Sequence, residues 1–391
     1  MDVDLIIVGG GLAGNCLALS LQNTGLKIAI IEAQSRQTID GAALGDRALA
    51  LAAGTVDALG SLDLWEGISH AATPIENIHV SDQGHFGKTH LSAKKENVPA
   101  LGYVIAARDL ENHIANHVAK LQNTTVFYST RVAGIISDEN AVFVSLKLEQ
   151  ESINLRAKLV VGADGGNSSV RQFLIITQHR TDYGQSALVT TISTSRPHQN
   201  VAYERFTSSG PLALLPLGTH HCAVVWTRKS DEAQALMQGS EADFIAQLQQ
   251  CFGYRLGELT LSAPRHAFPL SLIRADDITA NRAVIIGNAA HQLHPVAGQG
   301  FNLGLRDVTA LATMIAMQSD NDIGAPDFLA RYAKKRESDQ SRTIQFTDAL
   351  VHVFSNEWLA LAAARNLGLT LLDTLPFAKS ILAKHAMGLH L

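Results

Sequence analysis

The first 32 residues contain the feature that most restricts how this chain can fold. An apolar run at residues 5–8 leads into the turn GGGLAG, which is followed by a helical stretch and by the segment KIAIIE at residues 27–32, apolar between its two charged ends. This order predicts a strand, a tight turn, a helix and a second strand. The chain therefore begins with a βαβ unit, the building block of an α/β fold with parallel strands.

The glycines of this unit are spaced for a nucleotide. Gly9, Gly11 and Gly14 form the pattern GxGxxG, and Glu32 ends the second predicted strand. The first glycine allows a tight turn, the second lets the backbone approach a pyrophosphate, and the third lets the helix pack on the strand. An acid at the position of Glu32 can bind both ribose hydroxyls and disfavours a 2′-phosphate. We predict bound FAD or NAD; the alternative is a purely structural glycine turn.

Two later stretches, residues 75–92 and 187–228, show the apolar and polar alternation that predicts strands of an antiparallel sheet. Helical spacing dominates from residue 301 onward. We therefore predict α/β structure plus an antiparallel sheet. Further elements are predicted as helices at 109–121 and 241–251 and as buried strands at 159–161 and 282–287.

Charge and cysteine usage exclude several classes of protein. The formal net charge of −5 argues against a nucleic-acid partner, because such proteins carry basic surfaces. Cys16, Cys222 and Cys251 are far apart and match no zinc or redox pattern, which favours a reducing, cytoplasmic setting. Asp2 and Asp4 stand where a signal peptide has basic residues. No later run reaches the ~18 uninterrupted apolar residues of a membrane-spanning helix.

Four motifs together resemble the single-component flavoprotein aromatic hydroxylases. They are GxGxxG with Glu32, GDRALAL at 45–51, ADGGNSSVR at 163–171 and GNAAHQLHPVAGQGFN at 287–302. Their order and spacing match that family across nearly the whole chain. Within the family, the stretches HVSDQGH, YERFTSSGPLALLPL, CFGYRLG and LVHVFSN are most similar to the ubiquinone-biosynthesis hydroxylases that act on 2-octaprenyl-6-methoxyphenol.

The resemblance implies a Rossmann-like FAD-binding domain of the para-hydroxybenzoate hydroxylase type, with an inserted β-sheet substrate domain and a helical C-terminus. The implied division is a discontinuous FAD-binding domain at 1–74, 100–180 and 265–345, a substrate domain at 75–99 and 181–264, and a C-terminal helical segment at 346–391.

The resemblance also implies an FAD-dependent monooxygenase that uses NADH or NADPH as a transient co-substrate and O₂ to hydroxylate the ring of a polyprenylated phenol. Two alternatives stay open at this point: a sister hydroxylase of the same pathway that acts at another ring position, and a non-catalytic flavin-bearing subunit of a biosynthetic assembly. A flavin halogenase is disfavoured because its tryptophan-rich motif is absent.

Matching the family motifs residue by residue gives the expected cofactor-binding set. It comprises Gly9, Gly11, Gly14, Glu32, Arg47, Asp164, Gly165, Gly287, Asn288, Gly298, Gly300 and Asn302. The family usually has Asp in place of Asn288; the amide keeps an acceptor and adds a donor but loses the charge. For Arg47 the alternative is a surface ion pair, and for Asp164 a simple turn at the end of a strand.

The resemblance places Pro295 with its backbone carbonyl toward the reactive side of the flavin, and we expect His294 to contribute to catalysis. For His291 and His294, packing in the core and metal binding are the alternative interpretations, and we expect no metal. The expected substrate contacts are Tyr203, Phe206 and Leu214, although an alternating apolar strand more often belongs to the core.

The stretch 356–391 is mostly apolar with few charges. Two interpretations stay open: docking on the inner membrane or on a ubiquinone-biosynthesis assembly, and packing on the chain's own FAD-binding domain or on a second subunit. We expect a cytoplasmic protein. Peripheral membrane association follows from the first interpretation, and a homo-oligomer is compatible with the second.

Overall fold

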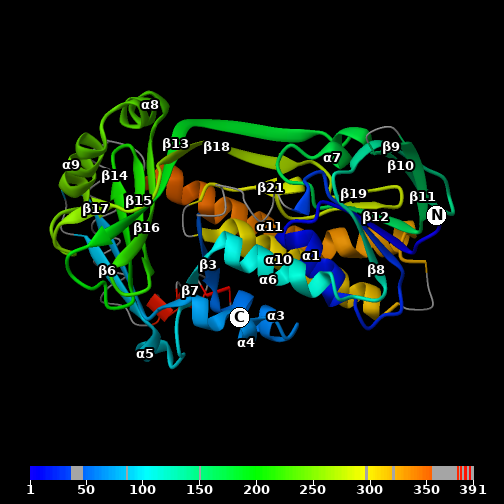
Figure 1. Ribbon diagram of the computed structural model, residues 1–391, viewed down its shortest axis with the longest axis horizontal. Helices are drawn as coiled ribbons and strands as arrows, with labels where there is room; N and C mark the ends of the chain where they lie inside the picture. Colours follow the sequence, from blue (N-terminus) through cyan, green and yellow to red (C-terminus); the bar gives the residue numbers. More distant parts are fainter. Residues whose placement is uncertain are drawn as a thin grey trace.

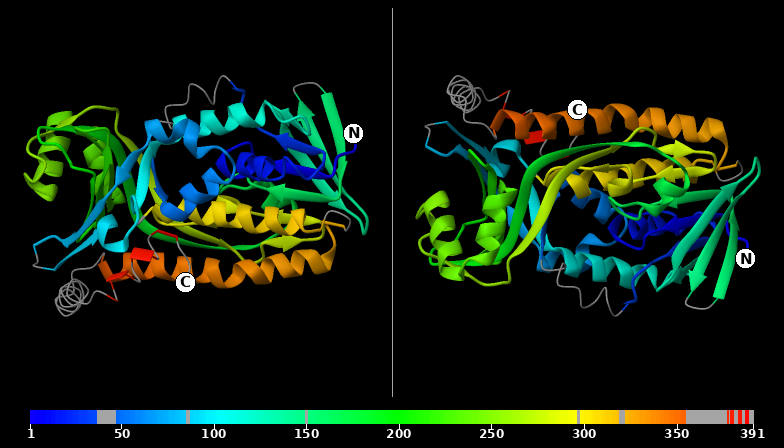
Figure 2. Two further views of the ribbon diagram at one scale, coloured as in Figure 1. Left: turned by 90° about the horizontal axis from the view of Figure 1, so that it is seen from below. Right: turned by 90° about the horizontal axis from the view of Figure 1, so that it is seen from above.

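The structure is a computed structural model. It describes residues 1–36, 47–84, 87–148, 151–295, 298–318 and 322–354, together with Phe377, Lys379, Ser380, Ala383, Lys384, Met387 and Gly388. Figures 1 and 2 show an elongated molecule. The N-terminal βαβ unit lies at one end, and a large sheet covered by two helices lies at the other.

Within the described residues, six strands form one sheet in the order β19-β20-β12-β1-β2-β8. All neighbours are parallel except β19 and β20. The strands are β1 (Leu5–Val8), β2 (Ile28–Ile31), β8 (Thr124–Phe127), β12 (Leu159–Gly162), β19 (Thr279–Ala280) and β20 (Ala283–Ile285). The βαβ unit and the buried strands predicted from sequence are therefore confirmed, and we call this the parallel sheet.

Two apolar cores cover the two faces of the parallel sheet. One packs it mainly against the helices α1 (Leu12–Ser20), α6 (Ala107–Val118) and α10 (Gln299–Ala316). The other packs it against an antiparallel sheet of β9 (Arg131–Ser137), β10 (Val142–Leu148) and β11 (Glu151–Ala157). The sequence interpretation identified no strands in 131–157, so this covering layer is an addition to it.

In the part of the chain that the structure describes, nine strands form a second, larger sheet. They are β5 (Asn77–Asp82), β6 (Lys88–Ser92), β13 (Gln178–Thr194), β14 (Val201–Thr207), β15 (Gly210–Leu217), β16 (His221–Lys229), β17 (Leu259–Leu261), β18 (His266–Ala275) and β21 (His291–Gln292). We call it the large sheet. The predicted antiparallel arrangement holds except at one place, because β14 and β5 are parallel.

Alternate side chains of the large sheet face two different cores. Leu212 and Trp226 pack with Phe244 of helix α9, whereas Phe206 packs with Val351 of helix α11. Helices α8 (Ser230–Gln238) and α9 (Glu241–Phe252) cover the first of these faces, which we call the outer face. The C-terminal end of α11 (Pro326–Phe354) packs against the other, the inner face, whereas its earlier part lies beside α10 (Figure 2).

A third group of elements joins the two sheets. It contains strands β3 (Ala48–Ala52), β4 (Thr73–Ile75) and β7 (Gly102–Ala106), which form a small antiparallel sheet, and the short helices α3 (Ala53–Gly60), α4 (Trp65–Ile68), η2 (Ser69–Ala71) and α5 (Ala93–Glu96). Two further short helices, α7 (Ser169–Phe173) and η3 (Gly287–Ala289), belong to the core between the parallel sheet and β9–β11. The small sheet packs against the inner face of the large sheet through Val104 and Ala202.

Several elements cross the division implied by the resemblance, among them α11 and β18. Helix α11 continues without a break past residue 345, and β18, which that division assigns to the FAD-binding domain, pairs along β13 of the large sheet. Among the described residues, no helix is both long enough and apolar enough to span a bilayer.

Candidate active site

The three glycines of the first turn are needed for three different reasons. Gly9 has a φ of +106°, and a Cβ there would lie 2.4 Å from the carbonyl oxygen of Ala163. A Cβ on Gly14 would lie 2.0 Å from the carbonyl oxygen of Gly9, so this glycine lets α1 approach β1. A Cβ on Gly11 would meet no protein atom within 4 Å. The middle glycine therefore keeps space open outside the protein, where a pyrophosphate can approach the backbone.

Glu32 lies directly beside this turn. Its carboxylate accepts a hydrogen bond from the backbone N–H of Gly10 at 2.7 Å through Oε2, and another from Gln34 at 2.7 Å through Oε1. These two bonds fix the carboxylate at the carboxyl end of β2, which is where ligands bind in open α/β sheets. The geometry suits the acceptor of ribose hydroxyls expected there.

The carboxylate of Asp164 forms hydrogen bonds with other residues of the protein. It accepts hydrogen bonds from the Ser168 hydroxyl at 2.5 Å, from the backbone N–H and hydroxyl of Ser169 at 2.6 and 2.8 Å, and from the N–H of Val170 at 3.1 Å. Asp164 thus holds the first turn of α7. Gly165 beside it has a φ of +82°, and a Cβ there would meet nothing within 4 Å, so the backbone at this strand end is open.

The segment from Gly287 to α10 brings the third glycine-rich site to the same place. A Cβ on Gly287 would lie 3.5 Å from the Cβ of Ala13, at the start of α1. Asn288 is exposed, and a Cβ on Gly300 would again meet nothing within 4 Å. Figure 1 shows α1 and α10 side by side, and the sites predicted at 9–14 and 287–300 therefore lie together.

Asn302 has a different environment from the other predicted cofactor residues. Its Oδ1 accepts from the N–H of Ala52 at 3.0 Å and from the Thr55 hydroxyl at 2.6 Å, while its Nδ2 donates to the carbonyls of Ala50 and Gly298 at 3.1 and 2.8 Å. The bonds with Ala50 and Ala52 join α10 to β3, the bond from Thr55 joins it to α3, and the bond to Gly298 lies at the start of α10 itself. Asn302 thus fixes the start of α10, which Gly298 enters with a φ of +61°.

These features fit FAD. Helices α1 and α10 both begin without an acidic residue in the first turn and, among the described residues, without a side-chain cap, so their N–H groups and positive dipole ends remain available to an anion or to the electron-rich edge of a flavin. The open backbone at Gly11, Gly165 and Gly300 leaves room for an extended dinucleotide.

A buried network of charged residues holds the segment 287–291 in place through Asp307. The sequence interpretation missed this network. The carboxylate of Asp307 accepts from the N–H of Gly287 at 3.1 Å, from Nε2 of His291 at 2.7 Å, from Nε of Arg336 at 2.8 Å and from Nε2 of Gln340 at 2.9 Å. Burial opposes the charge, but His291 and Arg336 bring the pKa of Asp307 well below its ordinary value. The sequence did contain a signal for this network: Asp307 is an acidic residue among the apolar positions of the helix predicted from residue 301 onward.

His291 and His294 belong to different environments. His291 is the buried partner of Asp307, whereas the ring of His294 lies edge-on to Tyr183, with 5.5 Å between ring centroids. Burial lowers the pKa of His294 to about 4, so the ring is neutral near pH 7. The Tyr183 hydroxyl donates to Asp348 at 2.7 Å, and burial together with that carboxylate raises the pKa of Tyr183. No group of three metal-ligating side chains occurs within the described ranges.

The remaining predicted residues are distributed more widely. Arg47 is half exposed and lies 3.8 Å from Glu111, which is the surface ion pair considered as its alternative; the preceding Asp46 lies outside the described residues. Tyr203 and Leu214 are buried in the core of the outer face. Phe206 lies on the inner face, beside Tyr183.

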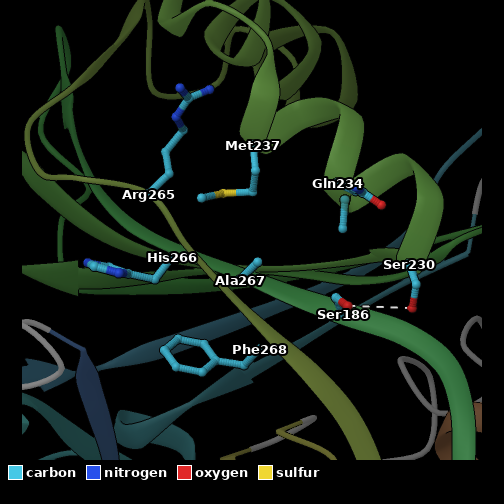
Figure 3. A pocket seen from close by; sticks show the side chains of 9 residues that line it. Ser186, Ser230, Gln234, Met237, Arg265, His266, Ala267 and Phe268 are labelled. Atoms are coloured by element: carbon cyan, nitrogen blue, oxygen red, sulfur yellow. Dashed lines mark hydrogen bonds between the residues drawn. The ribbon is translucent and has the colours of Figure 1, made fainter.

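A surface pocket of about 420 Å³ lies beside helix α8, lined by residues that include Ser186, Met237, Arg265 and Phe268 (Figure 3). It shares no residue with the glycine turns or with the segment 287–302. Of the residues that line it, Ala233 belongs to the core of the outer face and Met237 packs against that core. We therefore do not assign this pocket to the candidate active site.

Replacement of Glu32 by Ala is expected to weaken FAD binding without preventing it. The change removes hydrogen bonds to a charged acceptor, worth about 1.5–3 kcal/mol, which corresponds to a Kd higher by roughly 10- to 150-fold. Fluorescence titration of the apoprotein with FAD measures this. Glu66→Ala, in the short helix α4, is the control; an unchanged Kd in Glu32→Ala contradicts the assigned role.

Comparisons with known proteins agree with this geometry. The model of the FAD binding domain family matches residues 2–347. The ubiquinone hydroxylase UbiL of Rhodospirillum rubrum is 35% identical over 98% of this chain and 89% of its own length. The 3-demethoxyubiquinol 3-hydroxylase of Escherichia coli is 30% identical over 99% of this chain and 98% of its own.

Among solved structures, p-nitrophenol 4-monooxygenase of Pseudomonas putida superposes with a TM-score of 0.80 at 20% identity, covering 99% of this chain and 98% of the other. This confirms the predicted fold of the para-hydroxybenzoate hydroxylase type. Since the relatives are named as hydroxylases and monooxygenases, the non-catalytic alternative is set aside. The chain belongs to the FAD binding domain family and is an FAD-dependent monooxygenase of the ubiquinone hydroxylase group.

Proposed function

We propose that this enzyme hydroxylates the ring of a polyprenylated phenol of the 2-octaprenyl-6-methoxyphenol type in ubiquinone biosynthesis. The observation that carries the proposal is the similarity to named ubiquinone hydroxylases along nearly the full length of both chains. The likeness to more distant monooxygenases supports the fold alone. NADH or NADPH is the proposed electron donor, and O₂ the proposed source of the added oxygen.

In this proposal the glycine turns and helix ends hold the cofactor. Gly9, Gly11 and Gly14 let the pyrophosphate reach the backbone, and Glu32 binds a ribose. The start of α10 presents its N–H groups to the flavin ring. When bound, FAD supplies the redox and oxygen-transfer chemistry; the protein positions it, orients the substrate and excludes water.

Residues that precede α10 are proposed to lie against the face of the flavin on which the reaction takes place. Pro295 has no N–H and a fixed φ, which makes its carbonyl a rigid acceptor there. His294 is neutral near pH 7 because burial lowers its pKa to about 4. It therefore acts as a hydrogen-bonding and packing group beside Tyr183 and not as a source of protons.

The inner face of the large sheet suits an apolar ring. Partly exposed side chains of moderate size lie on it where a fully packed core would exclude solvent: Val189, Thr191, Ala213, Leu215 and Val225. Phe206 lies on the same face. We propose that this face, and not the outer face with Tyr203 and Leu214, contacts the substrate.

A sister reaction at another ring position remains the second candidate, favoured by the 30% identity to a 3-demethoxyubiquinol 3-hydroxylase. Quinone profiling separates the two. In a strain of the source organism that lacks the gene, we expect a phenol of the 2-polyprenyl-6-methoxyphenol type to accumulate, and expression of this chain to restore ubiquinone. Accumulation of a demethoxyubiquinol-type precursor instead indicates the sister reaction. A normal quinone pool in the deletion strain contradicts the proposed function.

Docking to a membrane or to a biosynthetic assembly stays a proposal for residues 356–391. Most of them lie outside the described residues. Of those that are described, Ala383 and Met387 are buried in the core that joins the small sheet to the large sheet, and the N–H of Gly54 donates to the Met387 carbonyl at 2.9 Å. These contacts support packing of that part on the chain's own domains, while Phe377 is 79% exposed and suits a surface contact.

A further inference from the structure

Glu204 is an acidic residue whose side chain lies on the inner face of the large sheet. Side chains alternate along β14, and its neighbours two residues away are both on that face: Ala202 packs against the small sheet, and Phe206 packs against Val351 of α11. Glu204 is paired with Ala213 of β15. The carboxylate therefore lies between the small sheet and α11, on the side of the large sheet proposed to contact the substrate.

The surroundings of Glu204 are apolar. Its cross-strand neighbours on the two sides are Ala213 and Val80, and the residue is largely, though not fully, buried. Burial raises the pKa of Glu204 to about 7, and no cation among the described residues offsets the effect. A carboxyl kept in such a place costs stability, so it points to a function.

The adjacent arginine does not neutralise this acid. Arg205 points to the opposite face, where it lowers the pKa of the Cys251 thiol on α9 against the larger effect of burial. The register places Asp82 next to Phe206 on the inner face, which adds a second acid and not a base. Glu204 thus faces the substrate side without a positive partner among these neighbours.

A chain of contacts leads from this face to the flavin-facing segment. Phe206 packs in the same cluster as Tyr183, and the Tyr183 ring lies edge-on to His294. Pro295 follows directly in the sequence. The inner face at Glu204 and Phe206 is therefore contiguous with the segment that is proposed to border the reaction side of the flavin.

We propose that Glu204 recognises the phenol hydroxyl of the substrate, accepting its hydrogen bond and then its proton. The inference rests on the proposed function. In the proton transfer the phenol O–H bond breaks, its electron pair stays on the phenol oxygen, and the proton bonds to a carboxylate oxygen of Glu204. The resulting phenolate ring is richer in electrons, which favours attack on it by an electrophilic oxygen. The apolar neighbours Ala213 and Leu215 hold the ring.

The test compares two probes that differ in this hydroxyl. FAD-loaded protein is titrated with 2-methoxyphenol and with 1,2-dimethoxybenzene, and the flavin absorbance reports binding. We expect the wild-type protein to bind the phenol about 10- to 100-fold more tightly than the ether, as for a hydrogen bond to a charged acceptor. In Glu204→Leu the preference should disappear while the ether binds as before.

Stability provides a second readout. A residue with a merely structural role would lower Tm when replaced, whereas Glu204→Leu should keep or raise Tm because it removes a poorly solvated carboxyl. Glu258→Gln, at an exposed position of the same domain, is the control and should change neither readout. An undiminished preference for the phenol in Glu204→Leu, or a lowered Tm, overturns the assignment of Glu204 alone. Wild-type protein that binds neither probe overturns the proposed phenol chemistry, and the assignment with it.

Discussion

Gly14→Val should give a protein that retains no FAD and is much less stable than the wild type. A Cβ at this position would lie 2.0 Å from the carbonyl oxygen of Gly9 and 3.0 Å from Cγ2 of Ile7. Neither neighbour can yield, because one is backbone and the other is a fully buried strand residue. Helix α1 must then move away from β1, which opens the glycine turn and the core below it.

Flavin content after purification and thermal unfolding measure the two effects. Two matched variants separate them. Gly11→Ala adds a Cβ that meets no protein atom within 4 Å, so it should lose FAD affinity while the apoprotein keeps its Tm. Gly60→Ala, where a Cβ also meets nothing within 4 Å, should change neither. A Gly14→Val protein that is yellow and as stable as the wild type would show that α1 and β1 do not meet as described.

Asp307→Asn is expected to cost about 3–5 kcal/mol of unfolding free energy, the usual result of removing one partner from a buried ion pair. The variant removes one of the two carboxylates that neutralise the buried Arg336, leaving only Asp339 at 2.6 Å, and it weakens the contact that orients His291. Chemical denaturation measures the loss. Asp327→Asn is the control on the same helix as Arg336: its partner Arg331 is exposed, and such pairs contribute about 0–1 kcal/mol.

The same network predicts a dependence on pH. The pKa of Asp307 in the folded protein is well below its ordinary value, so the unfolded chain takes up this proton first as the pH falls. The contribution of Asp307 to stability is therefore fully present above about pH 5 and is lost as the pH falls below about 4. The wild-type protein should lose stability in that range more steeply than Asp307→Asn. Parallel acid-unfolding curves for the two proteins contradict the network.

Local patterns in the sequence were sufficient for the nucleotide-binding half of the site. Gly9, Gly11 and Gly14 act within one turn, and Glu32 follows on the neighbouring strand, so spacing along the chain determines their arrangement. Asp307 could not be assigned in this way, because its partners come from residues 16 to 33 positions away. They meet it only after the segment 287–291 and α11 have both packed against α10.

The face of each strand in the large sheet was equally hard to predict. Alternation shows that Tyr203 and Glu204 point in opposite directions, but it does not say which of them faces the flavin. That depends on α9 covering one face and α11 the other. The parallel pairing of β14 with β5 has the same origin, because the strands are more than a hundred residues apart and no turn between them sets their direction.

The long pair of β13 and β18 limits how the enzyme can be divided or rebuilt. The ladder extends from Gln178, paired with Ala275, to Val189, paired with His266, and Figure 1 shows the two strands running between the ends of the molecule. The ladder is interrupted by one irregularity between Asp182 and Gln185 and pairs the two strands on both sides of it. The large sheet is therefore joined to the rest of the molecule by two paired strands and not by a single flexible segment. A chimera that exchanges substrate specificity between related hydroxylases must transfer both strands together, because cutting either one separates residues that were selected to pair.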